Sequence, residues 1–191
     1  DAGTGVVPEH RNKKVFSALF EYTIQQLKRH NIERYYLEVL QSNHQAVSIY
    51  SKKGFSVQRE YSVLTASGPG QGWNNHIAVI PYQDFTSFST RFSVEPSFEH
   101  TSYTINQNPQ LFEVLYLNNQ AYCIYAKRHG EIIQMHYNEL DALKDVVSAL
   151  INRYPSAMAK NIDCACCDVI QMLIDIGFVE ITKQYEMART I

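Results

Sequence analysis

Long apolar runs, cysteines and an excess of charge of one sign are all scarce in this sequence of 191 residues. No run approaches the roughly 18 consecutive apolar residues that a membrane-spanning helix requires, which excludes a transmembrane helix. The net charge is only −2 and 45% of the residues are hydrophobic, so a mainly disordered chain is excluded. The same charge balance argues against nucleic acid as the main partner. We therefore expect a folded protein that binds neither membrane nor nucleic acid.

Cysteine is represented by four residues, and three of them fall within positions 164–167. A disulfide framework in a small chain is denser and more evenly spread. A zinc site draws pairs of ligands from two separate segments, and only Cys123 lies elsewhere. The histidines show no ligand-like pair on one helix face. We therefore expect free thiols, a cytoplasmic location and no metal.

The first third of the chain alternates between patterns typical of strands and of helices. Residues 1–8 are typical of a strand end and a turn, and residues 15–30 have apolar side chains at helical spacing. Residues 35–40 and 55–64 are rich in β-formers. Between them, Asn43 is a good N-cap for a helix that ends near Lys53, where Gly54 follows. The order strand, helix, strand, helix, strand predicts an α/β fold.

The remaining chain begins with a glycine-rich loop, residues 65–75, whose Trp73 either lines a substrate pocket or anchors the loop. We expect a short strand at 76–80, a linker at 81–96 and a short helix at 97–108. Strands follow at 111–117, 121–126 and 131–137, with Asn118 and Asn119 in a tight turn. The last elements expected are a helix to about 154, a strand at 157–162, a helix ending near 176 and a strand at 179–187.

Two parts of the sequence resemble each other. The apolar spacing 16, 19, 20, 23, 27 returns as 143, 146, 147, 150, 154, and the helix stop at 53–55 returns at 176–178. We interpret them as two copies of one supersecondary unit, the second with shortened and altered loops.

The segment 6–16, V-V-P-E-H-R-N-K-K-V-F, is the best candidate for binding chemistry. Successive backbone N–H groups at a helix N-terminus bind anions, and Arg11, Lys13 and Lys14 add positive charge. A pyrophosphate would suit this segment. The alternative is a basic helix start that is simply solvated.

Together with a later segment, this loop resembles the GNAT acetyltransferase superfamily. Its second signature, N-x-x-A-x-x-x-Y-x-x-x-G-F, is matched by Asn43, Ala46, Tyr50, Gly54 and Phe55. Its acetyl-CoA loop, V-x-P-x-x-R-x-x-G-x-G/A, is matched by Val6, Pro8 and Arg11. The loop departs from the family at Lys14, where glycine is usual, and at Phe16, where glycine or alanine is usual.

The resemblance implies transfer of an acetyl group from acetyl-CoA to an amine, on a small molecule or a peptide. It implies that Tyr50 is the general acid that protonates the CoA thiolate, unless Tyr50 only packs beside Phe55. Glu38 is either the general base or a solvated strand residue. The residues implied to bind the cofactor are Val6, Val7, Arg11, Asn12, Lys13, Lys14, Val15, Phe16 and Asn43.

The resemblance also implies an organisation. Residues 1–80 resemble the C-terminal half of a GNAT domain that lacks an N-terminal segment, residues 81–96 are a linker, and residues 97–191 resemble a degenerate GNAT-like domain. In the second copy, acidic residues stand at 139 and 141 and Leu173 replaces the tyrosine. We expect an open sheet edge, which the chain either covers by forming a homodimer or leaves exposed, in which case it aggregates. The competing hypothesis is a non-catalytic binding or regulatory module that has lost the cofactor.

Overall fold

The computed structural model describes residues 3–69, 76–85 and 93–191. Its contacts divide the chain into two compact units, Asp1–Arg59 with Tyr185–Ile191 (unit 1) and Glu60–Gln184 (unit 2). The described residues form five α-helices and eight strands. The α/β class predicted from the sequence is confirmed. Trp73 and residues 86–92 of the predicted linker lie outside the described residues.

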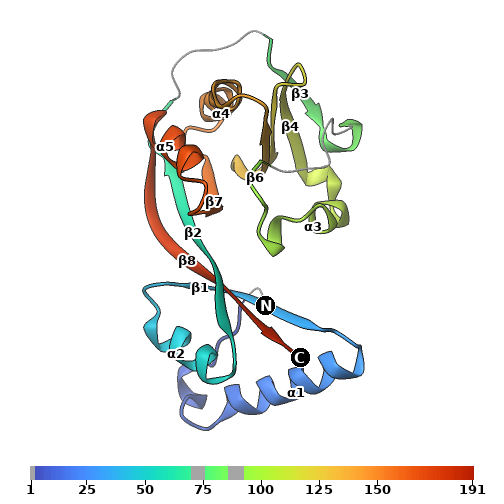
Figure 1. The fold of residues 1–191 in the computed structure, drawn as a ribbon, viewed down its shortest axis with the longest axis vertical. Helices are drawn as coiled ribbons and strands as arrows, with labels where there is room; N and C mark the ends of the chain where they lie inside the picture. Colours follow the sequence, from blue (N-terminus) through green and yellow to red (C-terminus); the bar gives the residue numbers. More distant parts are fainter. Residues whose placement is uncertain (1–2, 70–75, 86–92) are drawn as a thin grey trace. The chain divides into compact units, whose positions relative to one another are not determined.

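Unit 1 contains a short 3₁₀ turn (η1, Pro8–His10), helix α1 (Val15–Arg29), strand β1 (Arg34–Leu40) and helix α2 (His44–Lys52). Both helices pack on one face of β1 (Figure 1), where Phe20, Leu37 and Phe55 form a buried cluster. The strand end predicted at 1–8 is wrong for the described residues 3–7, which have no regular structure. The turn at Pro8 is confirmed.

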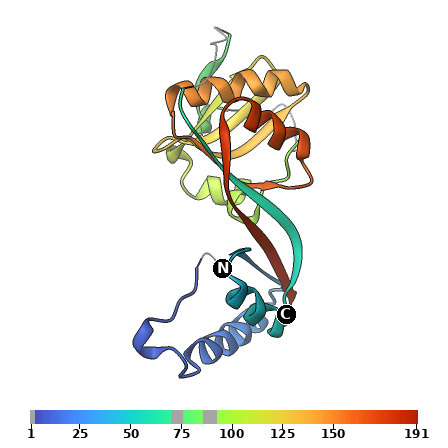
Figure 2. The same cartoon turned by 90° about the vertical axis from the view of Figure 1, so that its left-hand side faces the viewer.

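After residues 60–66 of β2 (Ser56–Ala66), unit 2 contains β3 (Ala78–Pro81), the turns η2 (Tyr82–Asp84) and η3 (Phe98–His100), helix α3 (Ser102–Gln107) and the turn η4 (Pro109–Leu111). It continues with β4 (Phe112–Leu117), β5 (Ala121–Ala126), β6 (Glu131–Tyr137), α4 (Leu140–Arg153), β7 (Met158–Asp163) and α5 (Cys167–Asp175). Asn118 and Asn119 have φ of 36° and 59°, the left-handed backbone of a tight hairpin turn. Figure 2 shows α4 lying across the strands of this unit, and its Leu143, Val146 and Leu150 are fully buried.

Two long strands pass from one unit to the other: β2 (Ser56–Ala66) and β8 (Phe178–Thr190). The strand order is β1-β8-β2-β7-β6-β5-β4-β3. In unit 2, β2 pairs antiparallel with β7, from Tyr61↔Asp163 to Thr65↔Met158. Each strand therefore serves both units, with β2 beginning in unit 1 and β8 ending there. The units defined by contacts therefore cut through both strands: most of β2 belongs to unit 2, and the end of β8 belongs to unit 1. The domains expected from the sequence, 1–80 and 97–191, are instead continuous stretches of the chain.

Strands β6 and β7 are parallel and pair only at Glu131↔Met158 and Ile132↔Ala159. Beyond these pairs, a cavity of about 10 Å³ lies between them, lined also by residues 94–96 and His100. The Gln134 amide donates to the His100 carbonyl at 2.7 Å, and the buried Ser97 lies 3.3 Å from the Asn161 amide nitrogen. Residues 94–96, the C-terminal end of the predicted linker, are therefore packed into unit 2.

Helices long and apolar enough to cross a membrane are absent from the described part of the chain. The same residues contain no group of three or more His, Cys, Asp or Glu side chains that could hold a metal ion. All four cysteines are free thiols, and burial raises the pKa of the Cys123 thiol.

Candidate functional site

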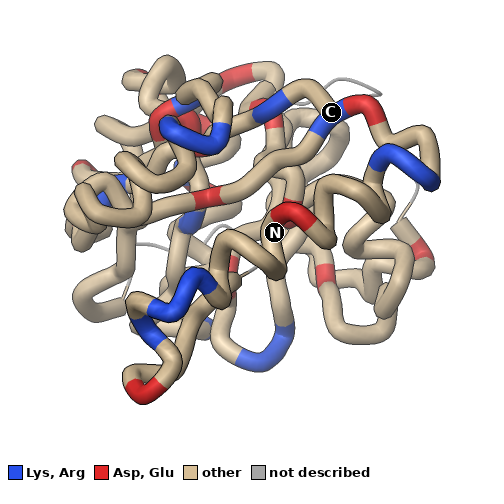
Figure 3. Tube along the Cα trace, turned by 90° about the horizontal axis from the view of Figure 1, so that it is seen from below, with Lys and Arg blue, Asp and Glu red and all other residues tan. Residues whose placement is uncertain are grey.

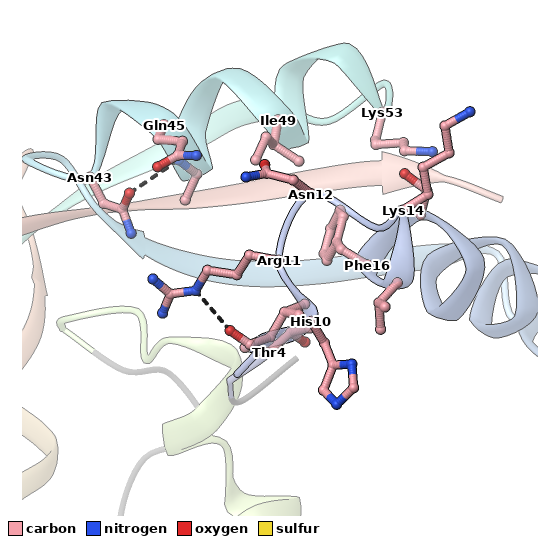
Figure 4. Close-up of a pocket in the computed structure, with 15 residues that line it drawn as sticks. Thr4, His10, Arg11, Asn12, Lys14, Phe16, Asn43, Gln45, Ile49 and Lys53 are labelled. Atoms are coloured by element: carbon pink, nitrogen blue, oxygen red, sulfur yellow. Dashed lines mark hydrogen bonds between the residues drawn. The ribbon is translucent and has the colours of Figure 1, made fainter. Parts of the chain in front are cut away.

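A cavity of about 540 Å³ lies in unit 1 between the loop that precedes α1 and one face of α2 (Figure 4). Seven of the nine residues predicted to bind the cofactor line it: Val6, Arg11, Asn12, Lys14, Val15, Phe16 and Asn43. Val7 and Lys13 are not among the lining residues. The loop and the start of α2, far apart in sequence, are thus brought together around one space.

The loop has a backbone suited to a tight approach by a ligand. Asn12 and Lys14 both adopt the left-handed conformation, with φ of 60° and 59°. Lys14 is the N-cap of α1, so it takes at the helix start a conformation that glycine adopts without strain. The Arg11 Nε donates to the Val6 carbonyl at 3.0 Å, which ties the two ends of the loop together.

Positive charge dominates the lining of this cavity. Arg11, Lys14 and Lys53 contribute cations, and no carboxylate is among the lining residues. The first N–H groups of the 15-residue helix α1 add to the field. Elsewhere, basic and acidic residues are interspersed along the chain (Figure 3). The cavity therefore has the chemistry of an anion site, and a pyrophosphate fits its donors.

Helix α2 presents one face to the cavity. Asn43 caps the helix, with its Oδ1 accepting from the Ala46 N–H at 3.1 Å, so the side-chain amide donors remain for a ligand. Ala46, Ile49 and Lys53 follow at spacings of three and four and line the cavity. Gln45, Ile49, Lys53 and His10 were not predicted from the sequence. The spacing from Ala46 was the signal that could have identified two of them.

Tyr50 lines a different cavity, of about 220 Å³, together with Phe20 and Tyr35. Phe16 lines both cavities and lies edge-on to Tyr50, at 5.9 Å between ring centroids. The ring centroids of Tyr50 and Phe55 are 5.7 Å apart, so Tyr50 also packs against the core of unit 1. Partial burial raises the pKa of the Tyr50 hydroxyl, which therefore keeps its proton at neutral pH.

Asn43 and Tyr50 are seven residues apart, a spacing that within a helix would place them on one face. The structure places them in different cavities. The seven-residue rule holds only within a helix, and Asn43, with φ −86° and ψ 65°, is a non-helical cap. Glu38 lies on β1 between Leu37 and Val39, which face the helices. Its side chain is half-buried with Oε1 shielded from solvent, so it is not simply a solvated strand residue.

Comparisons with known proteins agree with this geometry. Residues 2–55, which include the loop, α1 and α2, match the model of the acetyltransferase (GNAT) family. The fold is GNAT-like. A structure from Pyrococcus horikoshii, named as an acetyltransferase, superposes with a TM-score of 0.76 at 10% identity, covering 98% of this chain and 63% of that one. A comparison with curated proteins gives no match.

Two GCN5-related N-acetyltransferases show the same fold. That of Sphaerobacter thermophilus has a TM-score of 0.60 at 10% identity, covering 97% of this chain and 70% of that one. That of Anabaena variabilis has a TM-score of 0.55 at 14% identity, covering 97% of this chain and 53% of that one. The chain thus spans between about half and 70% of these proteins, and at such identities the likeness concerns the fold.

At the starts of α4 and α5, unit 2 has acidic residues where unit 1 has the cations of this cavity. Cys166 caps α5 with φ −86° and ψ 57°, close to the values of Asn43, but it offers a thiol in place of an amide. Glu139 caps α4, where unit 1 has Lys14. The Tyr137 hydroxyl donates to Asp168 at 3.2 Å, and burial and the nearby carboxylate raise the pKa of Tyr137 to about 12. Carboxylates at these helix starts would repel an anion.

Proposed function

We propose that the chain is an acyltransferase that moves an acetyl group from acetyl-CoA to an amine of a small molecule or peptide. The observation that carries this proposal is the cationic cavity at the start of α1, which gathers seven of the nine residues implied by the GNAT resemblance. Acetyl-CoA supplies an activated thioester. The chain supplies its binding and the proton.

Binding follows from the lining of the cavity. The backbone N–H groups at the start of α1, with Arg11 and Lys14, would hold the pyrophosphate. The side-chain amide of Asn43 would donate to an amide-bearing arm such as pantetheine. Phe16, in the place of a small residue, lines both this cavity and the one that Tyr50 lines, as Thr4 does, so the reactive end would reach Tyr50 beside this ring.

Tyr50 is the proposed general acid. Its hydroxyl holds a proton at neutral pH, because burial raises its pKa, and it can donate that proton to a leaving thiolate. In α5, Leu173 takes the place equivalent to Tyr50 and is fully buried, so that position offers no proton donor. We propose that residues 97–191 are a degenerate GNAT-like copy that shapes the protein and does not bind CoA.

Calorimetric titration of the full chain with acetyl-CoA tests the binding. Acetyl-CoA at 100 times its Kd should stabilise the fold by about 2.7 kcal/mol. Tyr50→Phe then tests the chemistry, because general acid catalysis contributes about 10²–10⁴-fold. We expect kcat to decrease by about 10²–10⁴-fold, while the Kd for acetyl-CoA stays within about twofold of that of the unmodified chain.

Tyr22→Phe is the matched control, since Tyr22 is 60% exposed on α1 and lines neither cavity. It should leave kcat unchanged. Unchanged turnover in Tyr50→Phe would remove Tyr50 from the mechanism. Absence of acetyl-CoA binding would favour the non-catalytic module, a hypothesis consistent with Phe16 standing between the two cavities.

A further inference from the structure

The end of the chain, Tyr185–Ile191, belongs to unit 1 although β8 begins in unit 2. Met187 is 1% exposed in the cluster that α1, β1 and α2 form around Phe20. The Ile191 N–H donates to the Glu33 carbonyl at 3.0 Å. This short segment is therefore built into the unit that carries the cationic cavity before α1, called the donor site below, although the residues that line this cavity lie more than 130 positions earlier in the sequence.

Arg189 is the charged residue of this segment that contacts α2. Its Nη1 donates to the backbone carbonyl of Lys53 at 2.7 Å. Lys53 is the C-cap of α2, where carbonyl groups have no partner within the helix and positive charge is favourable. A Cβ added to the next residue, Gly54, would lie 3.7 Å from the Arg189 side chain. Arg189 thus passes close over the end of the helix.

The same arginine is fixed from a second side. Its guanidinium carbon lies 5.6 Å from the centroid of the Phe20 ring, and the Lys53 ammonium lies 5.1 Å from that centroid. The ammonium also contacts Glu21 at 2.9 Å. Lys53 lines the donor cavity, whereas Arg189 does not. The backbone of Lys53 is therefore held by Arg189, and its ammonium is directed by Phe20 and Glu21.

We propose that Arg189 is a positioning residue for the donor site, which acts on CoA affinity by holding Lys53 at the cavity. This proposal rests on the proposed function, because it takes the cavity to be a CoA site. Arg189 lies at the unit 1 end of β8, a strand that begins in unit 2, so the last strand of the chain supplies the residue that holds Lys53.

A double-mutant cycle tests the proposal, with CoA as the probe and Kd measured by calorimetry on the full chain. Arg189→Met keeps an apolar stem over Phe20 and removes the hydrogen bond. It should raise the Kd for CoA about three- to tenfold, a coupling of the size found between residues in contact. In a Lys53→Met background, Arg189→Met should raise Kd less than twofold. A merely structural role would weaken binding equally in both backgrounds.

Two further variants complete the experiment. Arg189→Lys retains the charge and should recover part of the affinity, and it serves as the test should Arg189→Met fail to fold by circular dichroism. Lys183→Met is the control, because Lys183 is on the part of β8 that lies in unit 2. An unchanged Kd in both Arg189 variants, or equal losses with and without the Lys53 side chain, would overturn the proposal. Failure of the unmodified chain to bind CoA would refute the proposed function itself, and this proposal with it.

Discussion

Lys14→Gly should stabilise the protein, although it removes a residue of the candidate site. Lys14 has φ 59°, and a left-handed backbone costs a non-glycine residue about 1–2 kcal/mol. Glycine loses more conformational freedom on folding, which costs about 0.5–1 kcal/mol. The Lys14 side chain makes no capping hydrogen bond that would be lost. The net expectation is a free energy of unfolding that rises by about 0.5–1 kcal/mol.

Lys13→Gly is the matched control, because it removes the same charge from the same loop where φ is not positive. It should lower the free energy of unfolding by about 0.5–1 kcal/mol. Urea denaturation of both variants measures the difference, which should be about 1–2 kcal/mol in favour of Lys14→Gly. Equal destabilisation by the two substitutions would refute the argument. For CoA affinity the order of the two variants should reverse: Lys14→Gly should weaken binding more than Lys13→Gly, because Lys14 lines the cavity and Lys13 does not.

Two further expectations concern charged pairs. The Glu186 side chain is 3% exposed and accepts two hydrogen bonds of 2.9 Å from Arg59. Arg59→Met leaves this carboxylate buried without its cation, so it should lower the free energy of unfolding by about 3–5 kcal/mol. Adding Glu186→Met to the same chain should restore most of that loss. Burial would raise the pKa of Glu131, but His100 and Lys160 outweigh it and lower the pKa to about 2. The contribution of Glu131 to the free energy of unfolding, on the order of 2–3 kcal/mol, should be complete above about pH 4.5 and be lost as the pH falls towards 2. In Glu131→Gln, the free energy of unfolding should not show this decrease between about pH 4.5 and 2.

Local features of the fold could be predicted because they depend on neighbouring residues. Asn43 and Gly54 define the ends of α2 through a side-chain cap and a φ of 86°, and both signals are visible in the sequence. The hairpin at Asn118 and Asn119 follows from the same kind of local chemistry. The residues of the loop before α1 and Asn43, which line one cavity, were identified by motifs that span only 50 positions of the chain, 6 to 55.

The remaining features depend on contacts between distant segments. Nothing in β2 or β8 alone shows that the two strands pass between units, because alternation along a strand does not identify its neighbours. Arg189 could not be assigned to the donor site for the same reason. Phe16 was recognised as a departure from the family pattern, but its place between two cavities depends on where Tyr50 and Asn43 lie.

The segments around α2 and α5 show which features are set by the backbone and which by side chains. The cap-to-glycine distance is 11 residues in both, from Asn43 to Gly54 and from Cys166 to Gly177, and both glycines have positive φ. Helix length and the turn back to the sheet depend on that spacing, and both helices have 9 residues. Binding depends instead on the side chains at the helix starts, where unit 1 has cations and unit 2 has Glu139 and Asp168. A segment can therefore carry acidic residues at its helix start, keep the helix and its turn, and still be followed by a strand, as α5 is followed by β8, which ends in unit 1.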